Sequence, residues 1–504
     1  MVILAPLKKN IDSVIAAVIG FIFIQVLTKH SGIGISPDTI VYLSTARNLL
    51  AGRGWIDFSG SPLINFPLFY PTFLSTFSCI TGKDILSTAP FLNSFLFAAV
   101  IYLSGTIIEH FINTAKWYKW IILSIITFSP SLFEVYSMLW SETLFILLTI
   151  IFFISLRSYL KQPSYKNLLF VSVISAVAFV TRYAGITLLA TGVLLMLLEF
   201  SIGRRKKLIH ILLFGIIGIS LISLNLIRNF FQTKTLAGSR LKGNTPFSQN
   251  LNYFGTVMCD WFSFLKDHYS FASVLGIIIL IISIVTFFLH SINKQYSYSY
   301  EKILPAFFTV YSLFIILSST ISRYETINNR LLSPAYIPFI AGISYHLPYW
   351  QKNISKKLWQ ISYAIGICIL FIGFQYYQYK TNAKNYEDIK DDGIPGYAED
   401  IWKNSPVVQF IQKDTLLAKH ASQTFCNQNH AVYLFTGYSV TSIPERAHLK
   451  EVEQFHHYSN YYIIWFFTDE NPDLLSISEI KQHAYLTLVH QFSDGVIFYC
   501  ENNK

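Results

Sequence analysis

The feature that most constrains this chain is a series of apolar runs, each close to the length that crosses a lipid bilayer. Hydrophobic residues make up 53% of the 504 residues and charged residues 13%, about half the charge of a typical soluble domain. A transmembrane helix needs about 20 mostly apolar residues. We therefore predict a polytopic α-helical membrane protein with about eleven transmembrane helices. The predicted spans lie near residues 11–27, 85–108, 118–133, 139–157, 167–181, 184–200, 208–229, 271–290, 303–320, 331–349 and 358–376.

The basic residues indicate how the chain is oriented. Lysine and arginine gather in every second connection, whereas the short turns between them contain only Arg182, Arg323 and Arg330. Because loops rich in these residues stay in the cytoplasm, we predict a multi-pass plasma (inner) membrane protein with a cytoplasmic N-terminus. The segment 36–71 and the C-terminal region then lie outside, in the periplasm or extracellular space. The net charge of +10 follows from this topology, so membrane lipids are expected partners and nucleic acid is not.

The composition changes after the last apolar run. We predict a transmembrane domain at 1–376, a polar linker at 377–400 and a small external α/β domain at 401–504. Within that domain we expect a helix at 407–411 and buried strands at 431–435 and 461–467. A terminal hairpin is predicted from 484–490 and 495–500, with a turn at Asp494.

The five cysteines show neither a CxxC pair nor a Cys/His spacing typical of a metal site. Cys426 and Cys500 both fall in the predicted external domain. In an oxidising compartment these two cysteines could form a disulfide. Cys426 precedes the predicted strand at 431–435 and Cys500 ends the last predicted strand, so the bridge would form if these two strands are neighbours. Two buried free thiols are the alternative, and the sequence leaves both open.

The stretch 36–71, which follows the first predicted span, holds the most informative polar residues. Ser36 and Pro37 form a helix start, an N-cap followed by proline at the first helical position. On that helix Asp38, Tyr42 and Thr45 share one face. An amphipathic helix of this kind should lie in the membrane interface, so an acid is held at the membrane surface.

This stretch resembles the first external loop of the GT-C glycosyltransferases, in the branch of protein O-mannosyltransferases, aminoarabinose transferases and RgtA/B/C/D-like enzymes. Many members carry two adjacent acids here, whereas Thr39 follows Asp38 in this chain. The matching residues are Asp38, Tyr42, Ala46, Leu49, Gly52, Gly54, Pro67, Tyr70 and Pro71.

The resemblance implies a GT-C-like membrane glycosyltransferase, hexosyl or pentosyl. It would transfer a sugar from a polyprenyl-phosphate donor to an extracytoplasmic lipid, glycan or protein, in a reaction that inverts the anomeric carbon. Asp38 would be the general base, or else a first-turn acid that complements the helix dipole. Tyr42 and Tyr70 would line the substrate cavity, with an aromatic belt at the membrane interface as the alternative for Tyr70. No cofactor is expected beyond the lipid-linked sugar; a divalent metal stays open, with no ligand residues assigned.

Three charged residues at predicted outer helix ends are further candidates. Glu142 belongs to the sequence Ser-Glu-Thr at 141–143, and similar sequences recur in the GT-C family. Glu142 would contact the substrate in the cavity, or else stabilise the helix as an acid in its first turn. Arg182 and Arg330 would bind the donor phosphate, since a guanidinium binds phosphate bidentately, or else bind lipid headgroups.

Two other functions fit a chain of this composition. A transporter or flippase of lipid-linked sugars would place charges within its spans, whereas the acids and arginines here gather at one face. A non-catalytic envelope scaffold is the second alternative, because the second acid of the loop is missing.

Overall fold

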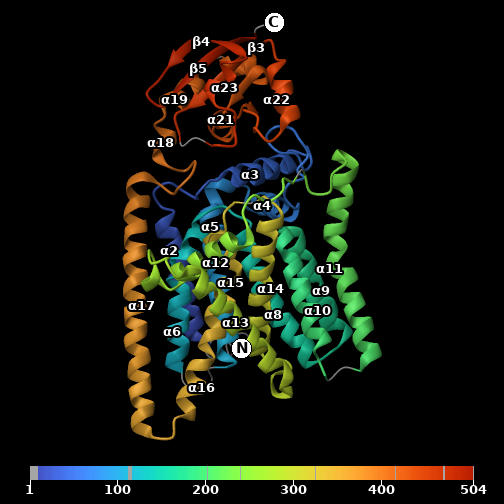
Figure 1. Ribbon diagram of the computed structural model, residues 1–504, viewed down its shortest axis with the longest axis vertical. Helices are drawn as coiled ribbons and strands as arrows, with labels where there is room; N and C mark the ends of the chain where they lie inside the picture. Colours follow the sequence, from blue (N-terminus) through green and yellow to red (C-terminus); the bar gives the residue numbers. More distant parts are fainter. Residues whose placement is uncertain are drawn as a thin grey trace. The chain divides into compact units, whose positions relative to one another are not determined.

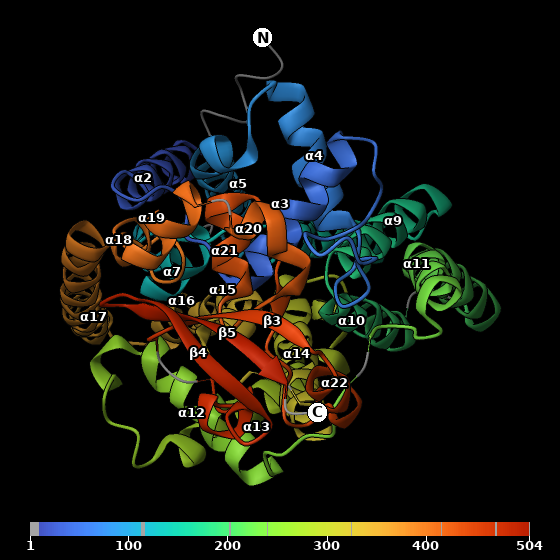
Figure 2. The same cartoon turned by 90° about the horizontal axis from the view of Figure 1, so that it is seen from above.

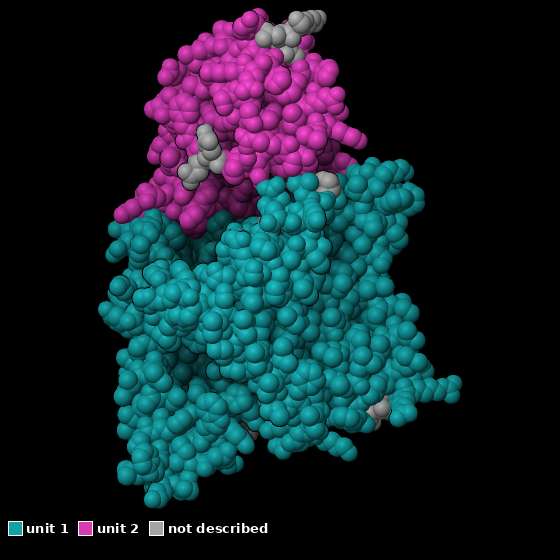
Figure 3. Space-filling view, in the orientation of Figure 1, with its two compact units in different colours: residues 1–29, 63–390 teal, residues 30–62, 391–504 magenta. Residues whose placement is uncertain are grey.

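The computed structural model describes residues 10–111, 116–200, 203–238, 240–323, 325–414, 416–468 and 471–502. The chain divides into two compact units, coloured separately in Figure 3. The helical unit contains residues up to 29 together with 63–390. The α/β unit contains residues 30–62 together with 391–504.

The helical unit is built from long apolar helices (Figure 1). The eleven predicted spans fall on helical residues, because helices satisfy the backbone hydrogen bonds of an apolar run in lipid. Two of them are each divided between two helices: 118–133 between α6 and α7, and 331–349 between α15 and α16. The helices are α2 (Ile11–Leu27), α4 (Phe69–Thr81), α5 (Ile85–Glu109), α6 (Lys116–Thr127), α7 (Pro130–Ser137), α8 (Glu142–Lys161), α9 (Tyr165–Thr181), α10 (Ile186–Leu197), α11 (Arg204–Thr233), α12 (Phe247–Trp261), α13 (Ala272–Ile292), α14 (Tyr300–Ile321), α15 (Asn329–Ser344), α16 (His346–Asn353) and α17 (Lys357–Asp392).

Six helices in the described part of the chain are long and apolar enough to cross a membrane: α5, α8, α11, α13, α14 and α17. The pair α6 and α7, bent by 46°, would be a seventh span. The helices α2 and α9 are apolar but shorter. The predicted fold class, mostly helical with a small C-terminal sheet, is confirmed, and the number of eleven spans stays a prediction.

A buried ion cluster joins three helix ends in this unit. The ammonium of Lys119 on α6 lies 2.8 Å from Asp12 Oδ1 on α2 and 2.8 Å from Glu109 Oε2 on α5. The α2 and α5 backbones approach closely there, since a Cβ at Gly105 would collide with Ser13. An unpaired buried charge is strongly unfavourable, so this pairing fixes all three ends together. The sequence analysis did not predict this pairing.

The α/β unit holds one five-stranded sheet in the order β2-β1-β3-β5-β4. The strands β1, β2 and β3 run parallel, and β5 pairs antiparallel with both β3 and β4, which lie side by side with it in Figure 2. Phe425, Phe455 and Ile463 belong to its buried core. The elements are α3 (Pro37–Leu50), α18 (Asp400–Lys403), α19 (Pro406–Lys413), α20 (Leu416–His420), β1 (Thr424–Cys426), α21 (Asn429–Thr436), β2 (Thr441–Ser442), α22 (Leu449–His456), β3 (Asn460–Phe466), α23 (Ile477–Ile480), β4 (Ala484–Gln491) and β5 (Gly495–Asn502).

The helix α3 belongs to this unit although it lies far away in the sequence. It starts as predicted: the Ser36 hydroxyl accepts a hydrogen bond from the Thr39 N–H, and Pro37 is the first helical residue. The chain before it is bonded to the C-terminal residues. The Tyr397 N–H donates to the Ile35 carbonyl at 2.8 Å, and the Ile394 N–H donates to Ser31 Oγ at 2.9 Å.

Local structure in the C-terminal region departs from expectation in two places. The range 431–435, predicted as a buried strand, lies within the helix α21, because a run of five apolar residues does not distinguish a strand from a buried helix. Where a polar linker was predicted at 377–400, α17 continues as far as Asp392. The helix at 407–411, the strand at 461–467 and the terminal hairpin are confirmed by α19, β3 and the β4–β5 pair.

Of the two alternatives left open for Cys426 and Cys500, a disulfide or two buried free thiols, the structure has the free thiols. Cys426 lies in β1, Cys500 lies in β5, and β3 separates these two strands in the sheet. Cys426 pairs with Ile464 and Cys500 with Tyr461, so the two thiols are also offset along β3. All five cysteines, which lie in the described residues, are free. Burial raises the pKa of both the Cys426 and Cys500 thiols to about 12, which keeps them protonated.

Candidate functional site

The most concentrated charge in the helical unit surrounds Glu142, whose side chain is completely buried in the first turn of α8. Its Oε2 lies 2.5 Å from Arg182 Nη1, and its Oε1 lies 2.6 Å from Arg330 Nε. Arg182 Nη1 also donates to Ser141 Oγ at 2.9 Å, and that hydroxyl donates to the Glu142 carboxylate at 3.3 Å. One buried carboxylate therefore holds two guanidinium groups in place.

Local backbone structure positions the first arginine. Arg182 is the extended residue that ends α9, just before a short 3-10 turn at Tyr183–Gly185. A Cβ at Gly185 would collide with the Phe179 backbone, so this tight turn requires glycine. The turn places the Arg182 side chain where α8 begins.

The second arginine is held by the start of α15. Asn328 caps that helix by accepting a hydrogen bond from the Leu331 N–H. The neighbouring Asn329 Oδ1 accepts from the Trp261 indole at 3.1 Å. The Arg330 guanidinium lies 4.4 Å from the centre of the Trp140 ring, a cation–π contact.

The guanidinium groups of this cluster are also suited to an anionic ligand. Besides Glu142, the acids near Arg330 are Glu325, 3.7 Å away and 43% exposed, and Glu134 on α7, which interacts with it electrostatically. The Arg182 and Arg330 side chains remain 16% and 12% exposed, so both are in reach of solvent. A guanidinium has five donors in a planar fork, which matches the oxygens of phosphate.

The structure thus brings together Glu142, Arg182 and Arg330, which the sequence analysis had named as separate candidates. Tyr70 belongs to the same unit, buried at the start of α4 with its ring centre 6.4 Å from that of Phe73.

Asp38 and Tyr42 belong to the α/β unit. Tyr42 is 2% exposed on α3, and Asp38 in its first turn is half-buried. The helix α3 packs against α21, which carries His430. Burial lowers the pKa of His430 to about 4, although the nearby carboxylates of Asp38 and Asp57 act in the opposite direction.

The sequence analysis missed Asp57 and His430. Asp57 is in the loop after α3, where its Oδ1 accepts hydrogen bonds from the Ser59 N–H at 2.8 Å and the Ser59 hydroxyl at 2.6 Å. His430 is about 390 residues from Asp38, and no local pattern links the two positions. The pairing could only be found once the fold joined α3 to α21.

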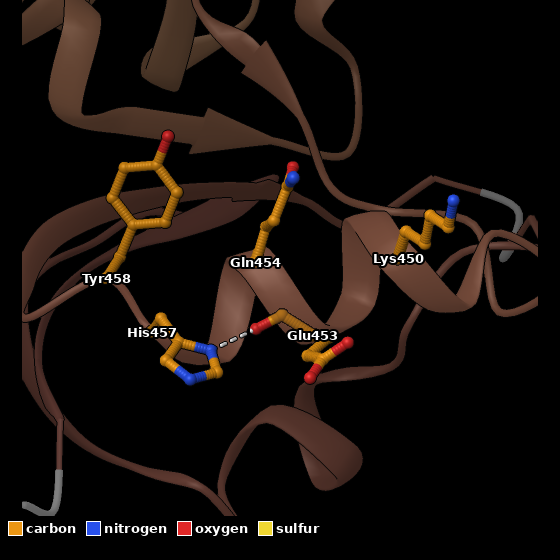
Figure 4. A pocket seen from close by; sticks show the side chains of 5 residues that line it. All are labelled: Lys450, Glu453, Gln454, His457 and Tyr458. Atoms are coloured by element: carbon orange, nitrogen blue, oxygen red, sulfur yellow. Dashed lines mark hydrogen bonds between the residues drawn. The ribbon is translucent and has the colours of Figure 1, made fainter.

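Metal-binding groups and surface hollows are the other features that could mark a site. In the described ranges, no three His, Cys, Asp or Glu side chains are arranged to hold a metal ion. A surface hollow of about 630 Å³ on α22 is lined by exposed side chains, among them Lys450 and Gln454 (Figure 4). Its His457 Nδ1 lies 2.7 Å from the Glu453 carbonyl of the same helix, so this contact is local.

Comparison with known proteins finds similarity in the fold and none in the sequence. No family model matches the chain, and no curated protein matches it in sequence. ArnT from Cupriavidus metallidurans, in the apo state and bound to undecaprenyl phosphate, matches with a TM-score of 0.54 at 11% identity. The alignment covers 98% of this chain and 98% of ArnT.

A second match is much weaker. Arabinofuranosyltransferase AftD from Mycobacteria aligns with 98% of this chain at 12% identity and a TM-score of 0.47, which is too low to define the fold. This chain spans 40% of the AftD length. ArnT is an aminoarabinose transferase of the GT-C type, so the resemblance inferred from the sequence is confirmed at the level of the fold.

Replacing Glu142 by glutamine tests the electrostatic role of the buried carboxylate. Glu142→Gln keeps the size of the side chain but leaves two neighbouring guanidinium groups without their shared counter-charge. Removing one partner of a buried ion pair costs about 3–5 kcal/mol, so the variant should unfold at a clearly lower temperature in detergent. Glu387→Gln, which changes an exposed acid on α17, is the matched control and should unfold like the wild type. Equal midpoints for both variants would contradict this description of the cluster.

Proposed function

We propose that this protein is a membrane glycosyltransferase that takes a sugar from a polyprenyl-phosphate donor and transfers it to an acceptor outside the cytoplasm. The observation that carries the proposal is the Arg182–Glu142–Arg330 cluster, located in a chain that shares the ArnT fold over nearly its full length. ArnT itself has been solved with undecaprenyl phosphate, which makes a lipid phosphate a reasonable donor here.

The arginine pair would act on the leaving group. When the bond between the anomeric carbon and the phosphate oxygen breaks, the phosphate gains negative charge. Arg182 and Arg330 would stabilise that charge with donors that Glu142 already holds in place, and donors fixed in advance need little reorganisation during the reaction. Glu142 would therefore act as a positioning residue for the two guanidinium groups.

Asp38 would act on the acceptor. As general base, its carboxylate takes the proton from the acceptor hydroxyl or amine while that group attacks the anomeric carbon. Direct displacement would invert the anomeric centre. Tyr42 and Tyr70 would contact the substrates, a divalent metal could assist, and the transferred sugar would be a hexose or a pentose.

The positions of the charges disfavour a flippase or transporter. Glu142, Arg182 and Arg330 lie at the start of α8, at the end of α9 and at the start of α15. Lys119, Asp12 and Glu109 also lie near helix ends. A transport pathway places ionisable groups at mid-membrane depth, which is not where these six residues lie on their helices.

The proposed orientation can be tested without a substrate. With a cytoplasmic N-terminus and an extracytoplasmic C-terminus, a periplasm-active phosphatase fused after residue 504 should be active. The same reporter fused near Arg205, in the basic first turn of α11, should be inactive, because clustered basic residues stay in the cytoplasm. The reverse pattern would place Asp38 in the cytoplasm and exclude the proposed reaction.

Asp38→Asn should abolish sugar transfer while the protein still folds and inserts. The change removes the base but keeps the size of the side chain, and general base catalysis typically contributes about 10²–10⁴-fold in rate. The assay follows transfer from a polyprenyl-phosphate sugar in proteoliposomes. The control is Asp84→Asn, which changes an exposed acid that caps α5 and should have no effect. Activity of Asp38→Asn within about threefold of wild type would show that Asp38 is not the base.

Arg182→Ala and Arg330→Ala should impair use of the donor more than use of the acceptor. A hydrogen bond to a charged group contributes about 1.5–3 kcal/mol, which corresponds to a loss of about 10–100-fold in kcat/KM for the donor. Arg330→Lys keeps the charge but loses the planar fork, so it should lie between alanine and wild type. Arg204→Ala changes an exposed arginine and is the control. Unchanged donor kinetics in both alanine variants would place the phosphate site elsewhere.

A further inference from the structure

A group of aromatic and titratable side chains lies around His430 inside the α/β unit, and of this group the reaction proposed above uses only Asp38. His430 is the second residue of α21, the helix that packs against α3. The His430 ring centre lies 5.1 Å from that of Phe58 and 6.5 Å from that of Tyr397. The His430 and Tyr397 rings are nearly parallel. The Phe58 ring also lies 5.1 Å from the ring of Tyr433.

The imidazole of His430 is neutral at physiological pH. Burial lowers its pKa to about 4 and outweighs the carboxylates of Asp38 on α3 and Asp57 in the following loop, which act to raise it. One ring nitrogen is then a donor and the other an acceptor. No side chain or backbone group among the described residues forms a hydrogen bond with either nitrogen, and the residue is only half-buried. The ring can therefore bind a polar group of a ligand.

The neighbouring polar groups of this cluster are engaged elsewhere. The Tyr397 hydroxyl donates to Gln428 Oε1 at 2.9 Å, and the Gln428 amide donates to Thr468 at 3.1 Å. Asp57 accepts two hydrogen bonds from Ser59, which hold it in its turn. His430 is thus the member of the cluster whose hydrogen-bonding capacity remains for a ligand.

We propose that His430 is a positioning residue for the acceptor, and that the acceptor is a carbohydrate which attacks through a hydroxyl group. The proposal rests on the glycosyltransferase function above and names its acceptor class. His430 would bind one hydroxyl of the sugar while Asp38 takes the proton from another. The new bond joins that oxygen to the anomeric carbon, and the bond from this carbon to the donor phosphate breaks, leaving a lipid phosphate.

The chemistry of the cluster favours a sugar over an amine. Two carboxylates, Asp38 and Asp57, would hold an amine in its protonated form, which cannot attack. A sugar presents an apolar C–H face and several hydroxyls, which match the rings of Phe58 and Tyr433 and the neutral imidazole. A neutral imidazole both donates and accepts, so it suits a hydroxyl better than it suits a cation.

Two substitutions of His430 separate positioning from packing. His430→Phe keeps a flat ring beside Phe58 and Tyr397 but removes both nitrogens. His430→Gln loses the ring but keeps one donor and one acceptor. The protein is reconstituted with a polyprenyl-phosphate sugar as donor, and the acceptor probe is the delipidated envelope glycan fraction from cells that lack the protein.

His430→Phe should raise the apparent KM for the glycan fraction by about 5–10-fold, the effect of losing one neutral hydrogen bond, and leave the donor KM unchanged. His430→Gln should recover most of this loss. His457→Phe, which changes an exposed histidine on α22, should behave like wild type.

The outcomes separate this inference from the function on which it rests. If the wild type is active and Asp38→Asn is inactive, but His430→Phe has an unchanged acceptor KM, the role of His430 is wrong and the function stands. If His430→Phe is normal and His430→Gln is impaired, the ring serves packing and the proposal fails. If the wild type transfers sugar to an amine and to no glycan, the acceptor class is wrong. If it transfers none, the proposed function fails as well.

Discussion

The structure depends on one constraint: a charge that is buried among apolar helices must be paired. Glu142 is completely buried, and its carboxylate is bonded to Arg182 and Arg330, so it ties the start of α8 to the end of α9 and the start of α15. Lys119 does the same for α2, α5 and α6 through Asp12 and Glu109. Apolar packing has little directional preference, whereas these ion pairs specify which helix ends meet.

The sequence predicts what depends on local pattern. Apolar runs locate the helices, because backbone hydrogen bonding in lipid leaves few alternatives. The start of α3 follows from Ser36 and Pro37, and the terminal hairpin follows from two β-rich runs joined at Asp494. The candidate residues Glu142, Arg182 and Arg330 were also found one by one, since ionisable groups at the ends of apolar spans are uncommon.

The sequence does not predict what depends on distant parts of the chain meeting. Arg330 is 188 residues from Glu142, so a single sequence gives no sign that they pair. The same holds for α3 and the C-terminal residues, which form one unit across more than 300 intervening residues. The error at 431–435 has a different cause, since a short apolar run fits a strand and a helix equally well. The state of Cys426 and Cys500 stayed open for a similar reason, because only the strand order shows that β3 lies between their two strands.

Burial has opposite consequences for the two kinds of nitrogen base in the candidate sites. An arginine side chain keeps its proton under all conditions found in proteins. Arg182 and Arg330 therefore stay charged although they are largely buried beside Glu142, and anions stabilise that charge. Histidine has an ordinary pKa close to neutrality, so the same desolvation makes His430 neutral even beside Asp38 and Asp57. A charged pair of guanidinium groups suits a phosphate, which gains charge when it leaves. A neutral imidazole suits a hydroxyl, which must be oriented without being held as a cation. In the function proposed above, the guanidinium pair would then suit the donor and the imidazole the acceptor of a glycosyl transfer.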